Sequence, residues 1–366
     1  MLLPLRHVLA ASSLVASPCL PRVTLAGFKM QLSRLLGLEA LAATQVLAAA
    51  TANTVNTTTA AATTACNGHG ELCGRRYSDV TVIGSHNSAF VGDSPAHNQY
   101  VSVTRQLDLG VRFLQAQTQD KGGVIELCHT YCWELDAGPL TAYLREVAAW
   151  LAAHPDEVLT LLLTNIDAIP VDKFDAAFDS AGLRQHVFRP ASGRLAKDQW
   201  PTLAELIGAG TRLVVFMDYH ADPSKVDYVM SEFDYFWETP YGVTDKAFPT
   251  CAVDRPGGGD PQKLMGIMNH MLNFKIGDIV FPDQLDAPRT NSLDSIRKQV
   301  DLCKGQGRPQ PNVILVSLRT LFLLLSFLHG WRLGPRDLTC DFSLTDVRAA
   351  SWTGSILARR KRRSWC

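Results

Sequence analysis

Short apolar runs alternate with amphipathic stretches from residue 76 onward. The runs are rich in Val, Leu and Ile, which is typical of buried parallel strands. They predict strands at Val80–Ile83, Val111–Gln117, Val124–Cys128, Val158–Asn165, Arg212–Asp218 and Asn312–Val316, with weaker candidates near Tyr235–Trp237 and Met268–Leu272. Apolar positions with helical spacing lie between them. They predict helices at Leu140–Ala153, Val171–Ser180, Thr202–Ile207 and Asn291–Leu302.

This alternation predicts an α/β fold, a TIM-like (β/α) barrel over residues 76–316, with a doubly wound open sheet as the alternative. The composition agrees, because 366 residues with 46% hydrophobic and 19% charged side chains fit a globular protein with one large core. Lys+Arg 35 and Asp+Glu 35 leave no net charge. A nucleic-acid partner is therefore not expected.

The first 52 residues have the pattern of a signal or precursor segment. A basic start at Met30–Arg34 precedes an apolar stretch at 35–47 and small residues at 48–52, which is the arrangement of a secretory signal. Residues 1–29 carry a similar basic and apolar pattern, so either Met30 is the start or the precursor is extended. The apolar run is short for a membrane span. We therefore expect a secreted or cell-surface protein.

Residues 53–75 are predicted to be a Thr/Ala-rich linker that ends in a small loop between Cys66 and Cys73. Asn56 begins an Asn-Thr-Thr acceptor for N-glycosylation. The stretch has too little apolar bulk to form a core. The sequence leaves a glycosylated lead-in and an unmodified linker equally open.

The nine cysteines favour disulfides. In an oxidising compartment, the six cysteines of residues 53–316 are expected to form three bridges. A zinc site that includes His129 is the alternative, but no second close pair of Cys or His ligands is visible. The expected pairs are Cys66 with Cys73, Cys128 with Cys132, and Cys251 with Cys303.

Two histidines each follow an apolar run. His86 comes after Val80–Ile83 and Gly84, and His129 comes directly after Val124–Cys128. We expect Gly84 to free the backbone to turn where the strand leaves the core. Parallel α/β folds assemble their active sites at the C-terminal ends of their strands. Two imidazoles that face one cavity can act as base and acid in phosphoryl transfer, although either histidine alone is more simply explained as structural.

Three motifs, in this order and spacing, resemble the X domain of phosphatidylinositol-specific phospholipases C. They are Ile-Gly-Ser-His-Asn-Ser at 83–88, Leu-Gly-Val-Arg-Phe-Leu-Gln-Ala-Gln at 109–117, and Leu-Cys-His-Thr at 127–130. Phe-Met-Asp-Tyr at 216–219 and Phe-Trp-Glu-Thr-Pro at 236–240 are similar to the secreted fungal branch of PLC-like phosphodiesterases. The resemblance implies a TIM-like barrel that cleaves the phosphodiester of an inositol phospholipid or glycosyl-inositide at a membrane surface, without a nucleotide cofactor.

The resemblance also assigns roles to residues. It implies that His86 is the general base for the attacking inositol hydroxyl and that His129 is the general acid for the departing diacylglycerol oxygen. A catalytically inactive relative that binds inositol phosphates or glycans is the alternative function. A glycerophosphodiesterase- or sphingomyelinase-type barrel is a third hypothesis, and it needs a metal-binding carboxylate cluster. The predicted substrate-binding residues are Asn87, Gln115, Gln117, Asn165 and Lys275.

Gln115 and Gln117 depart from the family pattern. Metal-dependent members have carboxylates at these positions, and metal-free bacterial members have an arginine that aligns with Gln117. Strand alternation places both glutamines on one face, toward the barrel mouth with Phe113 beneath. An amide brings no charge to a calcium site, so we predict no metal or other cofactor, with calcium disfavoured. Glu126 is the nearby carboxylate that could point inward.

The chain departs from the family again after Val316. Relatives have an Asp there that orients the base histidine, whereas this chain has Ser317, an apolar run at 321–328 and a basic stretch at 359–363. Val-Ser is also what a translated 5′ splice sequence encodes. We therefore interpret 317–366 as an atypical tail from a retained intron or an incorrect gene model. A tail anchor and a basic membrane patch are the alternatives.

Overall fold

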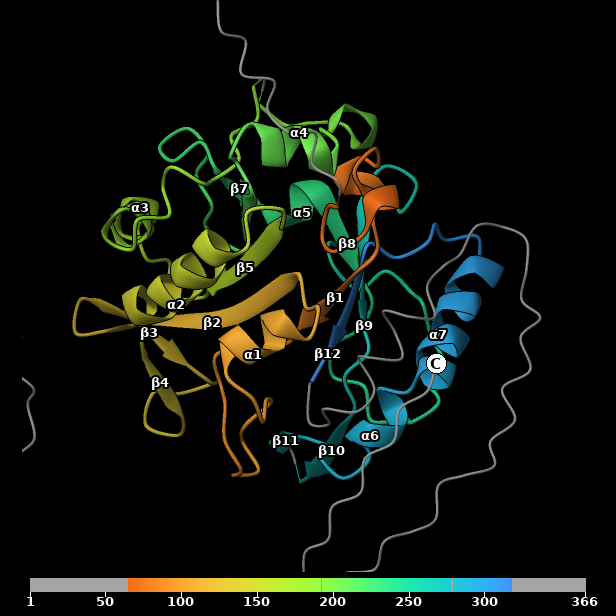
Figure 1. The fold of residues 1–366 in the computed structure, drawn as a ribbon. Helices are drawn as coiled ribbons and strands as arrows, with labels where there is room; N and C mark the ends of the chain where they lie inside the picture. The colour runs from red at the N-terminus through yellow and green to blue at the C-terminus, as the bar shows by residue number, and fades with distance from the viewer. Residues whose placement is uncertain (1–64, 192, 278, 318–366) are drawn as a thin grey trace, which may run out of the picture. The chain divides into compact units, whose positions relative to one another are not determined.

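The computed structural model describes residues 65–191, 193–277 and 279–317. The predicted signal segment at 1–52, Asn56 and the tail beyond Ser317 lie outside the described residues. The described chain has eight parallel strands, hydrogen-bonded in the order β7-β6-β5-β2-β1-β12-β9-β8 (Figure 1). They are β1 (Val82–Ser85), β2 (Phe113–Lys121), β5 (Leu159–Asn165), β6 (Leu213–Met217), β7 (Val229–Ser231), β8 (Phe236–Glu238), β9 (Met265–Asn269) and β12 (Val313–Val316).

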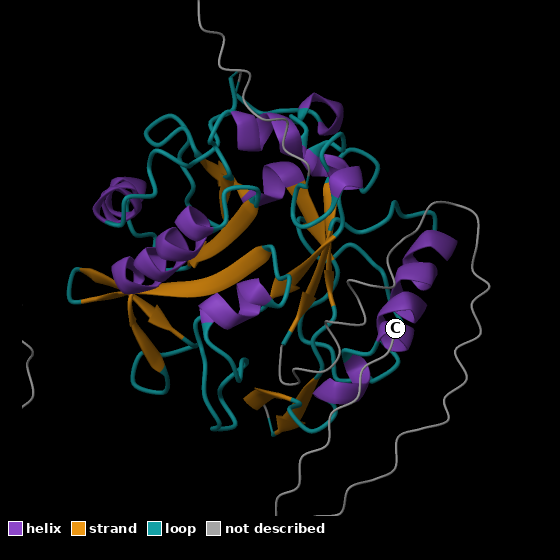
Figure 2. Cartoon of the chain, in the orientation of Figure 1, coloured by secondary structure: helices purple, strands orange, loops and turns teal. Residues whose placement is uncertain are grey.

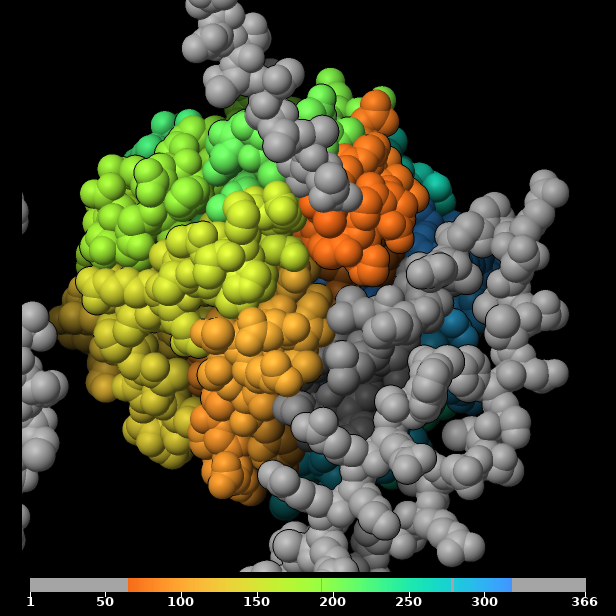
Figure 3. Space-filling view, in the orientation of Figure 1, coloured from red at the N-terminus to blue at the C-terminus, as the bar shows by residue number. Residues whose placement is uncertain are grey.

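Helices pack around the strands (Figure 2). The four predicted helices are present, and α2 and α3 have the predicted bounds. In the space-filling view, the orange surface of α1 adjoins the yellow-green surface of α2 (Figure 3). The helices are α1 (Val103–Asp108), α2 (Leu140–Ala153), α3 (Val171–Ser180), α4 (Leu203–Gly208), α5 (Glu232–Tyr235), α6 (Ala287–Thr290) and α7 (Leu293–Gly305), with 3-10 turns η1 (Gly70–Leu72), η2 (Tyr77–Asp79) and η3 (Lys197–Gln199).

The sheet curls into an incomplete barrel. The rings of Phe113 in β2 and Phe236 in β8 lie 6.2 Å apart between centroids, and those of Phe216 in β6 and Phe236 lie 5.0 Å apart. Because β8 stands at one end of the strand order, these contacts cross the interior. The described strands β7 and β8 are not hydrogen-bonded to each other, and α5 connects them. The predicted TIM-like barrel is therefore confirmed, with one open seam.

Two apolar layers follow from strand alternation. In β5, Leu159, Leu161 and Leu163 pack outward against the helices, whereas Leu162 packs in the barrel interior. Gly84 lies inside β1 on the interior face, where an added Cβ would be 2.8 Å from Leu315 Cδ1. The expected reason for this glycine was wrong, because it permits close packing in the interior and does not turn the chain.

The predicted strand Val124–Cys128 is present as β3, but it is not a barrel strand. It runs antiparallel to the extended end of β2, with Leu127 opposite Thr118. Gly122 and Gly123 have φ of 63° and 88°, which suits a tight two-residue hairpin turn. β4 (Asp136–Pro139) pairs with β3. A second hairpin joins β10 (Asn273–Ile276) and β11 (Ile279–Pro282), and the strand expected near 268–272 lies at β9.

Residues 65–75, which the sequence placed at the end of the linker, pack onto the barrel. Cys66 is fully buried among the interior apolar residues. The main-chain oxygens of Cys73 and Arg75 accept hydrogen bonds from Ala204 and Leu203 at 3.1 and 3.0 Å. A disulfide and a β-bridge make this segment compact despite its small side chains.

The three predicted disulfides are present in the structure. The Cα–Cα distances are 5.1 Å for Cys66–Cys73, 4.7 Å for Cys128–Cys132 and 5.1 Å for Cys251–Cys303. All three lie within the ordinary range for such bridges. The sulfurs of the predicted zinc alternative are therefore bonded to each other. Within residues 65–317 as described, no helix has the length and apolarity to cross a membrane.

Candidate active site

His86 follows β1 at the C-terminal end of the parallel strands. Its main-chain N–H donates to Val316 O at 2.9 Å, which extends the pairing of β1 with β12. Gly84, two residues earlier, faces the interior, so alternation places His86 at the inner edge of the barrel mouth. The Gln99 side chain donates to His86 O at 2.5 Å, and Asn98 Nδ2 lies 3.4 Å from His86 Nδ1.

The turn after His86 is held by β2. Asn87 has φ of 50°, a left-handed conformation that asparagine tolerates better than most residues. Its main-chain N–H donates to Gln115 Oε1 at 2.7 Å. The main-chain N–H and Oγ–H of Ser88 donate to Gln115 O at 2.8 and 3.0 Å. Gln115 therefore fixes the turn that carries His86.

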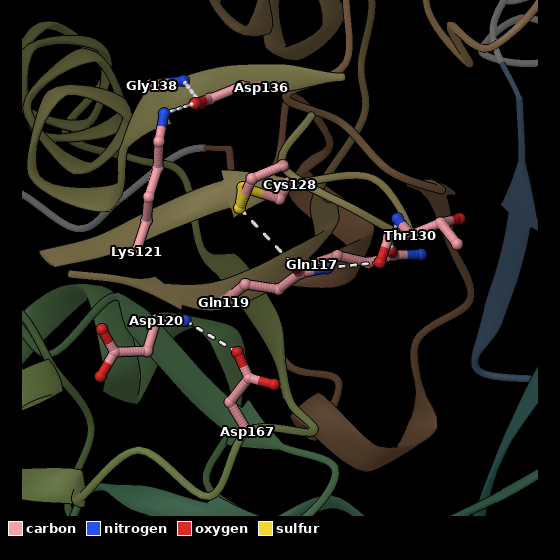
Figure 4. Close-up of a disulfide and its surroundings, with 10 residues drawn as sticks. Gln117, Gln119, Asp120, Lys121, Cys128, Thr130, Asp136, Gly138 and Asp167 are labelled. Atoms are coloured by element: carbon pink, nitrogen blue, oxygen red, sulfur yellow. Dashed lines mark hydrogen bonds and ion pairs between the residues drawn. A yellow bond between two sulfur atoms is a disulfide. The ribbon is translucent and has the colours of Figure 1, made fainter. Parts of the chain in front are cut away.

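β2 also holds the loop that carries His129. The Thr130 N–H donates to Gln117 Oε1 at 3.2 Å, and Gln119 Nε2 donates to Thr130 O at 2.8 Å. Figure 4 shows these glutamines beside Cys128 of the disulfide that closes the loop. Because side chains two apart share a strand face, one row of glutamines aligns both histidine-bearing loops.

The two predicted catalytic histidines face the same site. Burial lowers the pKa of His86 to about 3, and the charge of His129 adds to this effect. Burial also lowers the pKa of His129, with a further contribution from His97. The ring of Phe90 packs edge-on to His129 at 5.3 Å between centroids. Both imidazoles are therefore neutral at neutral pH in the free protein, and a bound anion would raise the pKa of each.

Carboxylates that sequence reasoning missed line the mouth on the side of β6, β8 and β9. Glu238 is buried, accepts from Asn269 Nδ2 at 3.0 Å and forms an ion pair with Arg255 at 2.6 Å. Asp218 is also buried, and its pKa is raised mainly by burial. Each follows or ends a buried strand that contributes Phe216 or Phe236 to the interior. The criterion that selected His86 would therefore have found both.

Glu232, the first residue of α5, adds a further buried acid. Burial raises its pKa well above the ordinary value, and the neighbouring Glu238 raises it further, while Arg255 opposes the shift. Its Oε1 is buried without a hydrogen-bond partner among the described residues. Burial therefore favours the protonated form of Glu232, which lies beside the ion pair of Glu238 and Arg255.

In the part of the chain that the structure describes, two predicted substrate-binding residues make no contact with the loops that Gln115 and Gln117 hold. Asn165 is fully buried, and its side chain bonds the main chain of Ile169 through both amide atoms at 2.9 Å. It continues the outward-facing series of Leu161 and Leu163, so placing it at the mouth was wrong. Lys275 is exposed in the β10–β11 hairpin, where it pairs with Val280. Asn87, Gln115 and Gln117 do lie with the histidines.

The residues present do not fit a calcium site. Gln115 and Gln117 each use Oε1 to accept a main-chain N–H, so these oxygens are already engaged. Among the residues that the structure describes, no group of three or more His, Cys, Asp or Glu side chains could hold a metal ion. Glu126 lies in β3, where burial raises its pKa, which disfavours the ionised form that a cation requires.

A separate pocket lies at the opposite end of the barrel. It is lined by Val82, Phe236, Met265 and Val313, which are the first residues of their strands, together with polar side chains such as Tyr77. The Tyr77 hydroxyl is hydrogen-bonded within the protein at 2.8 Å. This pocket carries neither histidine, so we place the candidate active site at the mouth.

Exposed apolar side chains gather around the mouth. In the described part of the chain, every exposed large hydrophobic residue lies in a segment that follows the C-terminal end of a barrel strand. Figure 1 shows the β3–β4 and β10–β11 hairpins and the loop before α1 on one side of the sheet. Trp133 is 81% exposed and Leu285 is 94% exposed. The set is Tyr100, Val124, Tyr131, Trp133, Ile166, Tyr219, Tyr241, Phe274, Ile276, Val280 and Leu285.

Comparisons with known proteins place the match over the barrel. The family model PI-PLC X 1 matches residues 72–320. A PI-PLC X domain-containing protein 1 from Arthroderma benhamiae is 48% identical over 260 residues, which cover 70% of this chain and 85% of that protein. An uncharacterized secreted protein from the same fungus is 41% identical over 262 residues, 69% of this chain and 59% of that protein, so the chain spans about three fifths of its length.

Among solved structures, the phosphatidylinositol-specific phospholipase C from Listeria monocytogenes is similar, with a TM-score of 0.46 and 13% identity. This match covers 68% of the present chain and 91% of the Listeria chain.

Proposed function

Because this chain belongs to the PI-PLC X domain family, we propose that it is a phosphodiesterase of the phosphatidylinositol-specific phospholipase C type that acts on an inositol phospholipid or glycosyl-inositide. One observation carries the proposal. Gln115 and Gln117, on one face of β2, hold the loops of His86 and His129 at a single barrel mouth. The two imidazoles are neutral in the free protein, and the charge of His129 affects the pKa of His86. Such a pair is suited to a reaction that needs one proton removed and one supplied.

In the proposed reaction, His86 takes the proton from the inositol hydroxyl as its oxygen attacks the phosphorus. The bond from phosphorus to the diacylglycerol oxygen breaks, and His129 gives that oxygen a proton. His129 must be protonated at this stage, although burial lowers its pKa in the free protein. The negative charge of the bound phosphodiester raises this pKa and so supplies the acid form.

The buried polar groups opposite the histidines support a hydroxyl-rich headgroup as substrate. Asp218 and Glu238 can accept hydrogen bonds from ring hydroxyls, and Arg255 keeps the pKa of Asp218 from rising further. Protonated Glu232 adds an O–H donor to this wall. A ring with hydroxyls around its edge can match both donors and acceptors, which an aliphatic alcohol cannot.

The exposed apolar residues support a lipid surface as the place of action. Tyr and Trp side chains are enriched at membrane interfaces because they combine an apolar body with a polar atom. Tyr131 and Trp133 stack at 5.6 Å between centroids on the loop closed by the Cys128–Cys132 disulfide. We propose that this rim meets the lipid interface and that the protein is secreted, which its three disulfides and its secreted relative favour.

A second candidate function is binding without catalysis. Its supporting observation is that the two β2 positions that carry charge in active relatives are glutamines here, engaged in holding the main chain. Stabilisation of developing charge is commonly the largest catalytic contribution, so its weakening favours an inositol phosphate or glycan receptor.

The two functions are separated by an assay on phosphatidylinositol vesicles. His86→Ala and His129→Ala should each lower the cleavage rate by roughly 10²–10⁴-fold, the usual contribution of a general acid or base. The control is His69→Ala, because His69 lies in the N-terminal segment that packs on the other end of the barrel. Wild-type protein that binds inositol phosphate but cleaves no inositol lipid would establish the receptor function instead.

A further inference from the structure

The ring of His86 is held by an amide. Asn98 lies in the loop between β1 and α1, is 1% exposed, and places Nδ2 at 3.4 Å from His86 Nδ1. Its own main chain is fixed, because Asn98 N–H donates to Phe90 O at 3.2 Å. The contact of Asn98 with Nδ1 is a hydrogen bond between a side-chain amide and the His86 ring. Nδ1 is thereby occupied, which leaves Nε2 to meet a substrate proton.

A base at Nε2 needs the proton of the neutral ring on Nδ1. The partner of Nδ1 must then be an acceptor, so Asn98 must present Oδ1 to the ring. With Nδ2 toward the ring instead, Nδ1 is the acceptor and the proton sits on Nε2, where it blocks proton abstraction. The two ends of an amide have nearly the same shape, so a half-turn exchanges them within the same space.

Asn87 couples this choice to a second amide. Asn87 Nδ2 donates to Asn98 Oδ1 at 3.1 Å, and Asn87 Oδ1 is buried with no hydrogen-bond partner among the described residues. If both amides turn, Asn98 Nδ2 donates to Asn87 Oδ1 and Asn98 Oδ1 accepts from His86 Nδ1. The hydrogen bond between the two amides is kept with its direction reversed. The unpartnered position then holds an N–H₂ donor, which can bond an anionic oxygen.

We propose that Asn98 is a positioning residue for His86 and that the Asn87–Asn98 amide pair selects which ring nitrogen carries the proton. In the base-competent arrangement, the protons run from His86 Nδ1 to Asn98 and from Asn98 to Asn87. The position after β12 carries Ser317, which is 8% exposed, in place of a carboxylate. The catalytic consequence rests on the proposed function, but the selection of the tautomer is a property of the free protein.

The test is long-range ¹H–¹⁵N NMR of the histidine side chains in the free protein at about pH 8, above the usual histidine pKa. For wild type we expect the His86 signals of the Nδ1–H tautomer. A wild-type His86 with its proton on Nε2 overturns the proposal. This measurement needs no substrate, so a protein without lipase activity still gives a decisive answer.

Variants of the loop sharpen the test. Asn98→Ala should return His86 toward the Nε2–H tautomer, which is the more stable one for a free imidazole. Asn98→Asp should keep Nδ1–H and raise the pKa of His86, since a carboxylate stabilises the imidazolium that His129 disfavours. Gln99→Ala is the matched control, because it removes a buried hydrogen bond to the main chain of His86 and leaves the ring contact intact. An unchanged tautomer in Asn98→Ala, or an equal change in Gln99→Ala, contradicts the selection by Asn98.

Activity gives an independent arm. With phosphatidylinositol vesicles, Asn98→Ala should lower kcat by about 10-fold or more with little change in KM, because the base is misoriented while the headgroup wall is intact. Asn98→Asp should recover kcat and shift its acid limb to higher pH. If wild type has the expected tautomer but cleaves no lipid, the phosphodiesterase function is rejected and the selection of the tautomer by Asn98 stands. If Asn98→Ala and wild type cleave lipid equally well, the positioning role of Asn98 is rejected and the phosphodiesterase function stands.

Discussion

Acidification should destabilise the fold through His86. The pKa of this imidazole is about 3 in the folded protein against 6.5 for the free side chain, mainly because of burial. The unfolded chain therefore binds a proton that the folded protein excludes. The contribution is fully present above pH 6.5 and is lost as the pH falls toward 3. Each pH unit in this window lowers the free energy of unfolding by about 1.4 kcal/mol, so pH 5 should cost about 2 kcal/mol relative to pH 8. This is an upper value, because the ring is not fully buried by surface area.

The assay is urea unfolding of wild type and His86→Gln at both pH values. Glutamine does not titrate and can still bond Asn98, so the comparison isolates the proton. The loss of stability between pH 8 and pH 5 should be smaller in His86→Gln by about 2 kcal/mol, whatever the cost of the substitution at pH 8. Equal losses in the two proteins would show that His86 is not desolvated and would refute this account of its environment.

Three further outcomes are expected. Replacement of Cys128 and Cys132 by Ser should lower stability by about 2 kcal/mol, the chain-entropy value for so short a loop, as measured by denaturant unfolding. The same replacement should also lower the rate of phosphodiester cleavage. An unchanged rate would show that the disulfide does not hold the loop of His129 in place. Activity should survive chelators, and its loss on chelation would mean that the assignment of Gln115 and Gln117 to a metal-free role is wrong. Trp133→Ala should weaken co-sedimentation with lipid vesicles without changing the melting temperature. Equal co-sedimentation of the variant and wild type would show that Trp133 does not contact the lipid surface.

The barrel could be predicted because buried parallel strands are nearly continuous apolar runs, as in Leu159–Asn165 and Leu213–Met217. The open seam could not be predicted, because the strands on its two sides are very short. β7 and β8 have three residues each, too few to show a strand pattern in the sequence. The direction of β3 was also missed. A strand run has the same pattern whether it pairs parallel or antiparallel, and the direction of β3 follows from the tight turn at Gly122 and Gly123.

The histidines and the β2 glutamines could be selected because each adjoins a recognisable run. Asn98 could not, since it lies in an irregular loop with no period, and its importance arises from a contact to His86 across 12 positions. Asn165 was misassigned for a related reason. Strand alternation decides the direction of a side chain, and Asn165 falls on the same parity as the outward-facing Leu163.

The seam between β7 and β8 has a mechanical consequence. In a closed barrel, a complete ring of main-chain hydrogen bonds fixes the circumference of the mouth. Here the ring of strands is interrupted between β7 and β8, and Glu238 on that edge of β8 bonds instead to the main chain of Asp254 and Arg255. Amide protons of β7 and β8 should therefore exchange with solvent sooner than those of β2 and β5.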